Sequence, residues 1–317
     1  MVTIIDRTLT TLDTDRIDTQ DLNHFCTLLF TCGVTKIELS YELAFRLKPF
    51  FIAGDSDEPI NTHTCFLTLN NNDDGTPIWK LEPNELAEKA IPPSQIKDLR
   101  NKKIRLLGLE DLITRNYLSI FQKLLNSGAH TLDLCPSNKM HCATAIALEW
   151  ILAGGTSVSC AFANYHDFPR LEEVLMGLKL RDPSSFKGDL SVLSQLKVLY
   201  EKITSLPISK TKAIIGNDIF KVESGIHVDG VIKNPATYEP FNPKTVGSQR
   251  EIVLGKHSGQ QSVLYKLREQ NLSETAAKSI LKQIKEGCTQ LGRNVSDLEL
   301  QSLVREVKND YETKIYC

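Results

Sequence analysis

The chain lacks the features that would assign it to a nucleic-acid-binding, exported or membrane class. Its 317 residues carry 37 basic and 39 acidic side chains, a formal net charge of −2. This balance gives no long-range field to gather nucleic acid or an anionic membrane surface. No apolar run approaches the roughly 20 residues that cross a bilayer. The first residues form neither a basic segment nor a long apolar one, so we expect a cytoplasmic protein without nucleic-acid or membrane partners.

Metal-binding cysteine patterns are missing as well. The eight cysteines include no C-x-x-C pair and no zinc-knuckle spacing. Because no export signal is evident, reduced thiols that are buried as small apolar residues are the simplest expectation.

Short apolar runs alternate with longer segments of helical period over the first two thirds of the chain. This alternation predicts parallel strands joined by helices. About six strands are expected, fewer than the eight of a closed barrel, so the predicted fold class is α/β with a partial or modified (β/α)8 TIM-type barrel. The stretches 70–77 and 83–93 are interpreted as a loop-rich insertion rather than barrel wall. The expected strands are 2–5, 34–39, 65–69, 104–107, 131–134 and 157–160, and the expected helices are 19–30, 115–125, 143–152, 171–180 and 190–203.

The sequence changes in character near residue 206. Residues 206–259 contain many Gly, Pro and Asn positions and few periodic runs, which predicts an irregular linker of the kind that carries functional groups. Three helices are expected after it, and Ser273 and Ser296 are predicted N-caps. The predicted domains are 1–205, a degenerate TIM-barrel-like domain, 206–259, a linker that contributes to the active site, and 260–317, a small C-terminal helical subdomain.

Glycine-flanked motifs dominate the linker. Residues 223–230 read E-S-G-I-H-V-D-G, residues 234–241 read N-P-A-T-Y-E-P-F, and residues 254–259 read L-G-K-H-S-G. Together they resemble the segment that follows the barrel in homocitrate synthases and isopropylmalate synthases, and most closely the homocitrate synthase of nitrogen fixation. Upstream, residues 4–9, 33–38 and 110–115 also resemble strands and motifs of this family.

The resemblance implies roles for two side chains of the linker. It implies that His227 is a catalytic acid or base for acetyl-CoA and the oxo acid, often in the active site of a neighbouring subunit, and that Tyr238 orients or donates beside it. An imidazole with its ordinary pKa of about 6.5 can move a proton at neutral pH, whereas a phenol at about 10 is better suited to donate a hydrogen bond. The alternative is that His227 only satisfies a buried backbone carbonyl.

Arg115 stands where the resemblance implies an arginine that binds the distal carboxylate of a dicarboxylic oxo acid. The alternative is a solvated arginine at a helix start, paired with Glu110 or Asp111.

Other polar residues are interpreted structurally. His257 and Ser258 suit the entry to a helix, with Ser258 as its N-cap. The adjacent acids Glu172 and Glu173 suit a solvated helix face, and Asp229 beside a glycine suits a turn.

The metal ligands of the family are absent from the matching positions. Thr10 and Thr11 stand where the family has Arg followed by Asp or Glu, and the seven histidines include no H-x-H pair. The family's charged loop is replaced by residues 161–170. A substitute site built from Cys135, from His141, or from His166 with Asp167 lacks a suitable ligand spacing. We therefore expect that this chain alone binds no metal and catalyses no condensation.

The resemblance then implies one subunit of a two-chain homocitrate synthase. The complex would convert acetyl-CoA, 2-oxoglutarate and water to homocitrate and CoA for synthesis of the nitrogenase iron-molybdenum cofactor. A divalent ion, Mg, Mn or Zn, would be held by a metal-bearing partner subunit and act as a Lewis acid on the oxo acid. A dimer or hetero-oligomer is expected. The alternatives are a non-catalytic regulatory or assembly partner, an isopropylmalate or citramalate synthase-like subunit, and an independent enzyme with altered chemistry.

Overall fold

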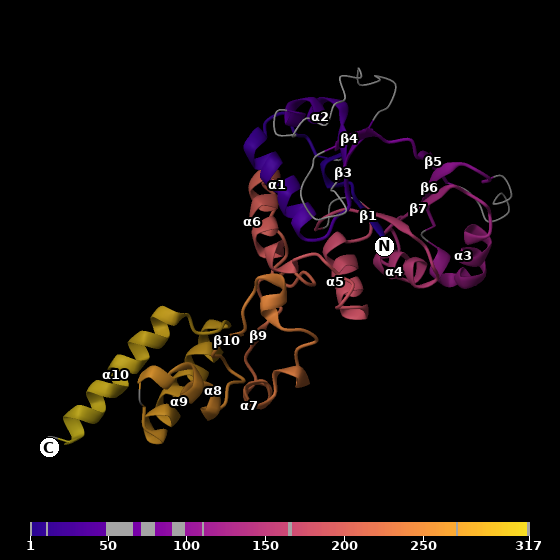
Figure 1. The fold of residues 1–317 in the computed structure, drawn as a ribbon. Coiled ribbons are helices and arrows are strands. Elements are labelled where there is room, and N and C mark those ends of the chain that lie inside the picture. Colours follow the sequence, from indigo (N-terminus) through magenta and orange to yellow (C-terminus); the bar gives the residue numbers. More distant parts are fainter. Residues whose placement is uncertain are drawn as a thin grey trace. The chain divides into compact units, whose positions relative to one another are not determined.

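A computed structural model describes residues 2–10, 12–48, 66–70, 80–90, 99–109, 111–163, 167–270 and 272–315. The chain forms two compact units, Met1–Gly216 and Asn217–Cys317, called unit 1 and unit 2 below. Figure 1 shows their elements coloured along the chain. Residues 217–259 and 260–317, which the sequence analysis treated as separate segments, fall in the same unit.

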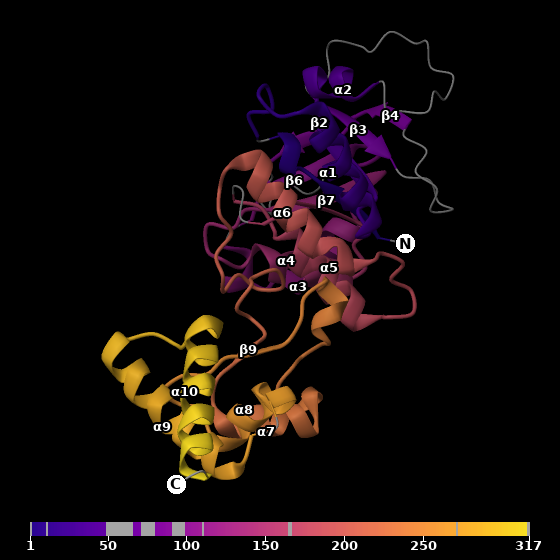
Figure 2. The same ribbon diagram turned by 90° about the vertical axis from the view of Figure 1, so that its left-hand side faces the viewer.

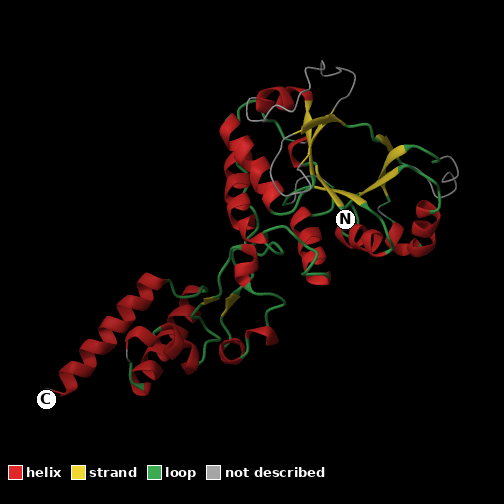
Figure 3. Ribbon diagram, viewed as in Figure 1, coloured by secondary structure: helices red, strands yellow, loops and turns green. Residues whose placement is uncertain are grey.

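Unit 1 is built around a curled sheet with helices outside it (Figure 1, Figure 3). Its strand order is β4-β3-β2-β1-β8-β7-β6-β5. Except for β4 and β5, which lie at the two ends of the sheet, chain neighbours are sheet neighbours, and β1 lies beside β8; this is the order of strands in a (β/α)8 barrel. In sheet order, strands β2, β1, β8, β7, β6 and β5 are all parallel to one another. Strand β3 is antiparallel to both β2 and β4. The strands are β1 (Thr3–Asp6), β2 (Lys36–Ser40), β3 (Phe66–Asn70), β4 (Lys80–Pro83), β5 (Ala87–Lys89), β6 (Lys103–Gly108), β7 (Thr131–Pro136) and β8 (Ser157–Cys160).

The α/β class is therefore confirmed, but the strand prediction was incomplete. All six predicted strands are present, at β1, β2, β3, β6, β7 and β8. The interpretation of residues 83–93 as loop was wrong in part, because β4 ends at Pro83 and β5 spans Ala87–Lys89. Both are short edge strands, and the side chains of β5 are exposed. Strand β5 therefore shows no apolar alternation. Pairing of β4 with β3 and of β5 with β6 is what makes both of them strands.

The curled sheet has an apolar outer face and a polar inner face. Strands β2, β6, β7 and β8 begin K-I-E-L, K-I-R-L, T-L-D-L and S-V-S-C. Polar and apolar side chains therefore alternate between the two faces of the sheet. Arg105 of β6 binds Glu38 of β2 at 2.9 Å although three strands separate β6 from β2 in the sheet. They can meet only across the inside of the curl, so the charged positions point inward. A closed barrel of this type is filled mainly by bulky branched apolar residues.

Helices cover the outer face. The predicted helices 19–30, 143–152 and 171–180 end within one residue of those observed. Helix α2 was missed because it is short; Ser40 accepts a hydrogen bond from the amide of Leu43 at its start. Helices α1 and α6 lie side by side (Figure 1, Figure 2). The elements are η1 (Thr8–Thr10), α1 (Thr19–Thr31), α2 (Tyr41–Leu47), η4 (Leu112–Thr114), α3 (Tyr117–Leu125), α4 (Ala143–Leu152), α5 (Leu171–Arg181), η5 (Leu190–Val192) and α6 (Leu193–Thr204).

Unit 2 is mainly helical. Its core is formed by apolar residues of α8, α9 and α10, among them Ile280, Ile284 and Val304. The two predicted N-caps are confirmed: Ser273 accepts from the amide of Ala276, and Ser296 exchanges hydrogen bonds with Glu299 in a capping box. The elements are β9 (Lys221–Val222), α7 (Gly225–Lys233), η6 (Pro235–Thr237), η7 (Pro243–Val246), β10 (Glu251–Ile252), α8 (Gln260–Lys266), η8 (Arg268–Gln270), α9 (Glu274–Leu291) and α10 (Asp297–Ile315).

The expectation of irregular structure throughout residues 206–259 was wrong at α7. The helix buries Val228 and Val231, three residues apart on one face. Burial of these two valines favours the helix although a glycine lies within it. None of the described helices combines the length and the apolar composition needed to cross a bilayer.

Candidate functional site

Two of the predicted site residues meet in unit 2. The ring centroids of His227 and Tyr238 are 4.8 Å apart, with the ring planes inclined by 46°. His227 lies on α7 and Tyr238 directly follows η6. Both side chains are exposed, Tyr238 to 43%, so His227 is not buried against a backbone carbonyl.

Glycine at position 230 permits this contact. A Cβ atom there would lie 2.2 Å from Cε2 and 3.1 Å from Cδ2 of Tyr238, closer than side chains tolerate. His227 and Gly230 are three residues apart and therefore share a face of α7. The chain returns over this face because Asn234 is extended and Pro235 starts η6 with its restricted φ.

The residue after Tyr238 is held by a bidentate ion pair. The Nε and Nη2 atoms of Arg250 lie 2.5 and 2.7 Å from the two carboxylate oxygens of Glu239. The Glu239 side chain is only 8% exposed, and paired hydrogen bonds of this kind are geometrically specific. The backbone that carries Tyr238 is therefore anchored at its C-terminal side.

The L-G-K-H-S-G loop folds around Glu223. The backbone amide of His257 donates to Oε1 of Glu223 at 2.9 Å, and the Asn294 side chain donates to Oε2 at 3.3 Å. A Cβ atom at Gly255 would lie 2.5 Å from Oε1 of Glu223. The glycine thus permits the close approach of the loop to the carboxylate.

Ser258 closes this loop rather than capping the following helix. Its hydroxyl accepts from the amide of Gly255 at 2.9 Å. The predicted N-cap role was wrong, because Gly259 is the N-cap residue of α8. A Cβ atom at Gly225 would lie 2.9 Å from the Cα of Gly259. The first and last motifs therefore pack against each other backbone to backbone.

The residue before His227 on α7 is also exposed to solvent. Ile226 is 78% exposed. Asp229 is helical and pairs with Lys233 at 2.7 Å, one helical turn further on. The prediction that Asp229 shapes a turn was wrong, because α7 continues through it.

Arg115 lies in unit 1, beyond the carboxyl end of β6 and directly after η4. Its Nε donates to Oδ2 of Asp111 at 2.8 Å and its Nη2 reaches the same oxygen. The side chain is 53% exposed. This is the surface pair that the sequence analysis gave as the alternative; Glu110 lies outside the described residues. Arg115 belongs to unit 1, whereas His227 and Tyr238 belong to unit 2.

Of the residues that the resemblance places at the metal-ligand positions, the structure describes Thr10 and shows its hydroxyl engaged elsewhere. The hydroxyl of Thr10 donates to the backbone carbonyl of Arg7 at 2.8 Å. Burial raises the pKa of the Cys135 thiol to about 11, although Arg7 acts in the opposite direction. His141 is exposed, and Thr11 and His166 lie outside the described residues. Within the described ranges, no three His, Cys, Asp or Glu side chains converge as ligands.

The inner face of the curled sheet carries a charged network that the sequence analysis missed. Arg105 lies 2.6 Å from Asp133 and 2.9 Å from Glu38, and all three side chains are fully buried. Arg7 lies 2.7 Å from both Glu38 and Glu88. The signal in the sequence was a polar or charged residue at every second position of β2, β6, β7 and β8.

Mutual pairing compensates the burial of these charges. Burial acts to lower the pKa of Arg105, but the carboxylates of Asp133 and Glu38 outweigh it and raise the pKa above its ordinary value. Ser157 and Ser159 donate to Asp133 at 2.7 and 2.6 Å. A divalent ion placed here would be repelled by two guanidinium groups and would compete with them for the same carboxylates. The residues present do not fit such an ion.

Two further acids are buried outside this network. Burial raises the pKa of Asp6 to about 7 although Thr8 donates to it twice. Glu172 is fully buried, so its assignment to a solvated face was wrong. Burial raises its pKa as well, although Lys212 lies 2.9 Å away and opposes the shift. Lys212 lies 40 positions further along the chain, so neighbouring residues gave no sign of this burial.

Comparison with known proteins supports the motif-based interpretation. Residues 214–292 match the family model described as homocitrate synthase post-HMGL domain-like. The chain is 32% identical to the homocitrate synthase omega subunit of Clostridium pasteurianum, over 98% of this chain and 97% of that protein. It is 36% identical to homocitrate synthase AksA of Methanothermobacter thermautotrophicus, over 53% of this chain and 46% of that one. It is 41% identical to (R)-citramalate synthase CimA of Methanocaldococcus jannaschii, over 43% of this chain and 28% of that one.

Proposed function

Because the chain belongs to the homocitrate synthase family, we propose that it is one subunit of a two-chain homocitrate synthase. In this complex it presents His227 and Tyr238 to an active site whose metal is held by a partner subunit. The reaction joins acetyl-CoA and 2-oxoglutarate and, with water, yields homocitrate and CoA. We propose synthesis of the nitrogenase iron-molybdenum cofactor as the use of the product.

The observation that carries this proposal is that the side chains of His227 and Tyr238 lie in contact with each other and are both exposed to solvent. Gly230 makes room for the Tyr238 ring and Arg250 anchors the residue after it. Neighbouring Ile226 is 78% exposed. Exposed side chains whose geometry is already set suit a site that is completed by another surface, because little conformational entropy remains to be lost on docking.

The inner face of the curled sheet supports a division of labour between two chains. Its central positions are occupied by Arg7, Arg105 and their carboxylate partners. A partner subunit with three converging ligands would hold Mg, Mn or Zn, which polarises the carbonyl of the bound oxo acid. The omega subunit of Clostridium pasteurianum, by its name, is one subunit of a synthase. Its similarity to this chain, at 32% identity, extends over 97% of its length.

In this scheme His227 acts as a general acid or base. The new carbon–carbon bond forms between the acetyl methyl carbon and the oxo carbon, so the methyl group loses one proton and the oxo oxygen gains one. The exposed imidazole is suited to one of these transfers at neutral pH. The Tyr238 hydroxyl donates a hydrogen bond beside it, and water then cleaves the thioester to release CoA.

The test is reconstitution with a metal-bearing homocitrate synthase subunit, followed by assays of CoA release and homocitrate formation. His227→Ala should lower turnover by about 100-fold or more, as expected for loss of a general acid or base, while complex formation is retained. Lys233→Ala, on the same helix and paired with Asp229 at the surface, is the matched control and should retain turnover. A complex that forms with His227→Ala and stays fully active would contradict the proposal and favour a regulatory or assembly partner.

A further inference from the structure

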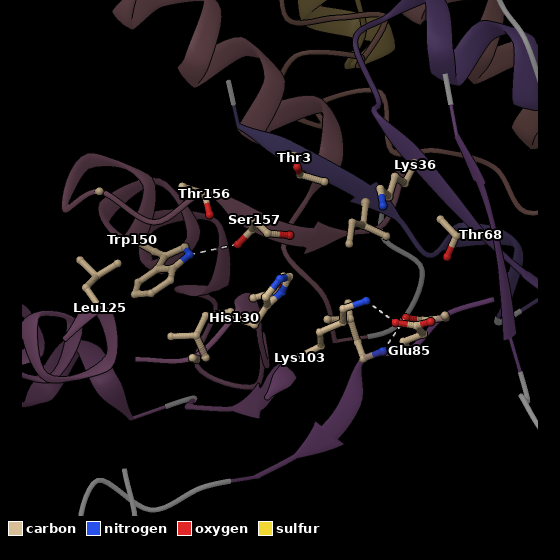
Figure 4. Close-up of a pocket in the computed structure, with 17 residues that line it drawn as sticks. Thr3, Lys36, Thr68, Glu85, Lys103, Leu125, His130, Trp150, Thr156 and Ser157 are labelled. Atoms are coloured by element: carbon tan, nitrogen blue, oxygen red, sulfur yellow. Dashed lines mark hydrogen bonds and ion pairs between the residues drawn. The ribbon is translucent and has the colours of Figure 1, made fainter. Parts of the chain in front are cut away.

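A cavity opens at the amino ends of the strands in unit 1. Its volume is about 600 Å³, and the first residues of five strands line it: Thr3, Lys36, Lys103, Thr131 and Ser157. Figure 4 labels four of them, Thr3, Lys36, Lys103 and Ser157, around the opening. Active sites of (β/α) barrels lie at the opposite, carboxyl ends of the strands, where Arg115 follows β6. This amino-end cavity is therefore separate from the site proposed above.

One side of the amino-end cavity is basic. Lys36 and Lys103 enter it from strands β2 and β6, and Glu85 and Thr68 lie beside them (Figure 4). Lys103 is paired with Glu85. Lys36 is half-buried and forms no ion pair with any residue in the described part of the chain. Among the described residues of this side, two ammonium groups face one carboxylate, an excess of one positive charge.

The other side of the cavity is apolar. Leu125, Leu132 and Trp150 line it, and Figure 4 shows Leu125 and Trp150 on the side away from Lys36. The Trp150 indole is fixed, because its Nε1 donates to the backbone carbonyl of Ser157 at 3.0 Å and its ring packs edge-on against Phe121. This wall is therefore formed in advance of any ligand.

The described residues of the deeper wall add no unpaired negative charge. Ser157 donates to Asp133, and Arg105 neutralises that carboxylate from the far side. An anion that enters the cavity thus meets a hydroxyl group and paired charges rather than a free carboxylate. The volume falls within the range of small-molecule sites, about 300–1,000 Å³.

We propose that the amino-end cavity binds a small organic acid. Its acidic group lies between Lys36 and Lys103, and its hydrocarbon part lies against Leu125 and Leu132. Every group involved belongs to unit 1. The site is therefore independent of His227 and Tyr238, and the isolated full chain suffices to test it.

The test is calorimetric titration of the full chain with four probes: hexanoate, hexanol, hexylamine and inorganic phosphate. Hexanoate should saturate one site, and the other three should bind at least about tenfold more weakly, since each lacks the acidic group or the hydrocarbon chain. Raising the salt concentration should weaken the binding of hexanoate, because the ammonium groups are partly exposed.

Single substitutions test which residues bind hexanoate. Lys36→Gln and Leu125→Gln should each weaken hexanoate binding by about tenfold, whereas Lys36→Arg should keep it because the charge is retained. Lys102→Gln is the matched control, because Lys102 is exposed beside Lys103 but does not line the cavity. Absence of hexanoate binding, tighter binding of phosphate, or equal losses in Lys36→Gln and Lys102→Gln would each overturn the proposal.

Discussion

Gly230 leaves the space that the Tyr238 ring occupies, because a Cβ atom at position 230 would lie 2.2 Å from Cε2 of that ring. The ring in turn lies beside the imidazole of His227, at 4.8 Å between centroids. The second glycine of the G-I-H-V-D-G motif therefore acts on the candidate site through the position of an aromatic ring.

Gly230→Ala should separate catalysis from stability. Alanine favours a helix interior by up to about 1 kcal/mol over glycine, but the added methyl group must displace Tyr238 from His227. We expect turnover of the reconstituted complex to fall by at least about tenfold, as misplacement of a site residue does. Gly287→Ala on α9, where a Cβ atom meets nothing within 4 Å, is the control and should leave turnover unchanged. Full activity of Gly230→Ala would refute the positioning role.

Arg105→Met should be strongly destabilising. It leaves the buried carboxylates of Asp133 and Glu38 without their central counter-ion, which typically costs about 3–5 kcal/mol. Urea denaturation would measure the change in the free energy of unfolding. Arg115→Met removes an exposed arginine and should change this free energy by no more than about 0.5 kcal/mol. Similar losses in the two variants would show that the buried network does not contribute in this way.

Asp6 should make stability fall as the pH rises. Its folded-state pKa of about 7 lies above the ordinary value of about 3.9 that applies in the unfolded chain. The folded state therefore holds the proton more tightly, so the contribution of Asp6 is fully present below about pH 4 and is lost as the pH approaches 7. Relative to Asp6→Asn, the natural protein should lose up to about 1.4 kcal/mol per pH unit in this window.

Urea denaturation of both proteins at several pH values between about 4 and 8 would give this difference. The exposed acid Asp13 provides the control variant, Asp13→Asn, which should follow the natural protein. Parallel curves for the natural protein and Asp6→Asn would show that the Asp6 carboxyl is ionised in both states.

Arg115→Gln tests the predicted contact with the distal carboxylate of the oxo acid. In the reconstituted complex we expect the KM for 2-oxoglutarate to rise by about tenfold, because a bidentate ion pair is lost. Asp111→Asn should have the opposite effect, since it releases the guanidinium that Asp111 now holds. Arg181→Gln, an exposed arginine at the end of α5, is the control. Unchanged KM values in the Arg115 and Asp111 variants would show that Arg115 does not bind the oxo acid and only forms a surface ion pair with Asp111.

The elements that sequence reasoning missed share a physical cause. Helix α7 contains glycine, which disfavours helices in isolation, and is supported by the burial of Val228 and Val231. Strands β4 and β5 are short and depend on pairing with β3 and β6. Glu172 reads as a surface acid because Lys212, which neutralises it, is remote in sequence. In each case a distant contact outweighs the local preference.

The sequence by itself determined the local features of this protein. Apolar periodicity located six strands and most of the helices, and the glycine-flanked motifs identified His227 and Tyr238. The resemblance also predicts that Thr10 and Thr11 stand in place of metal-site residues of the family. Only the tertiary structure decided which groups meet: Glu38 and Arg105 lie on strands separated by three others and touch across the curl at 2.9 Å. Alternation along a strand specifies the face that a side chain points to, but the partner it finds there depends on how the whole sheet curls.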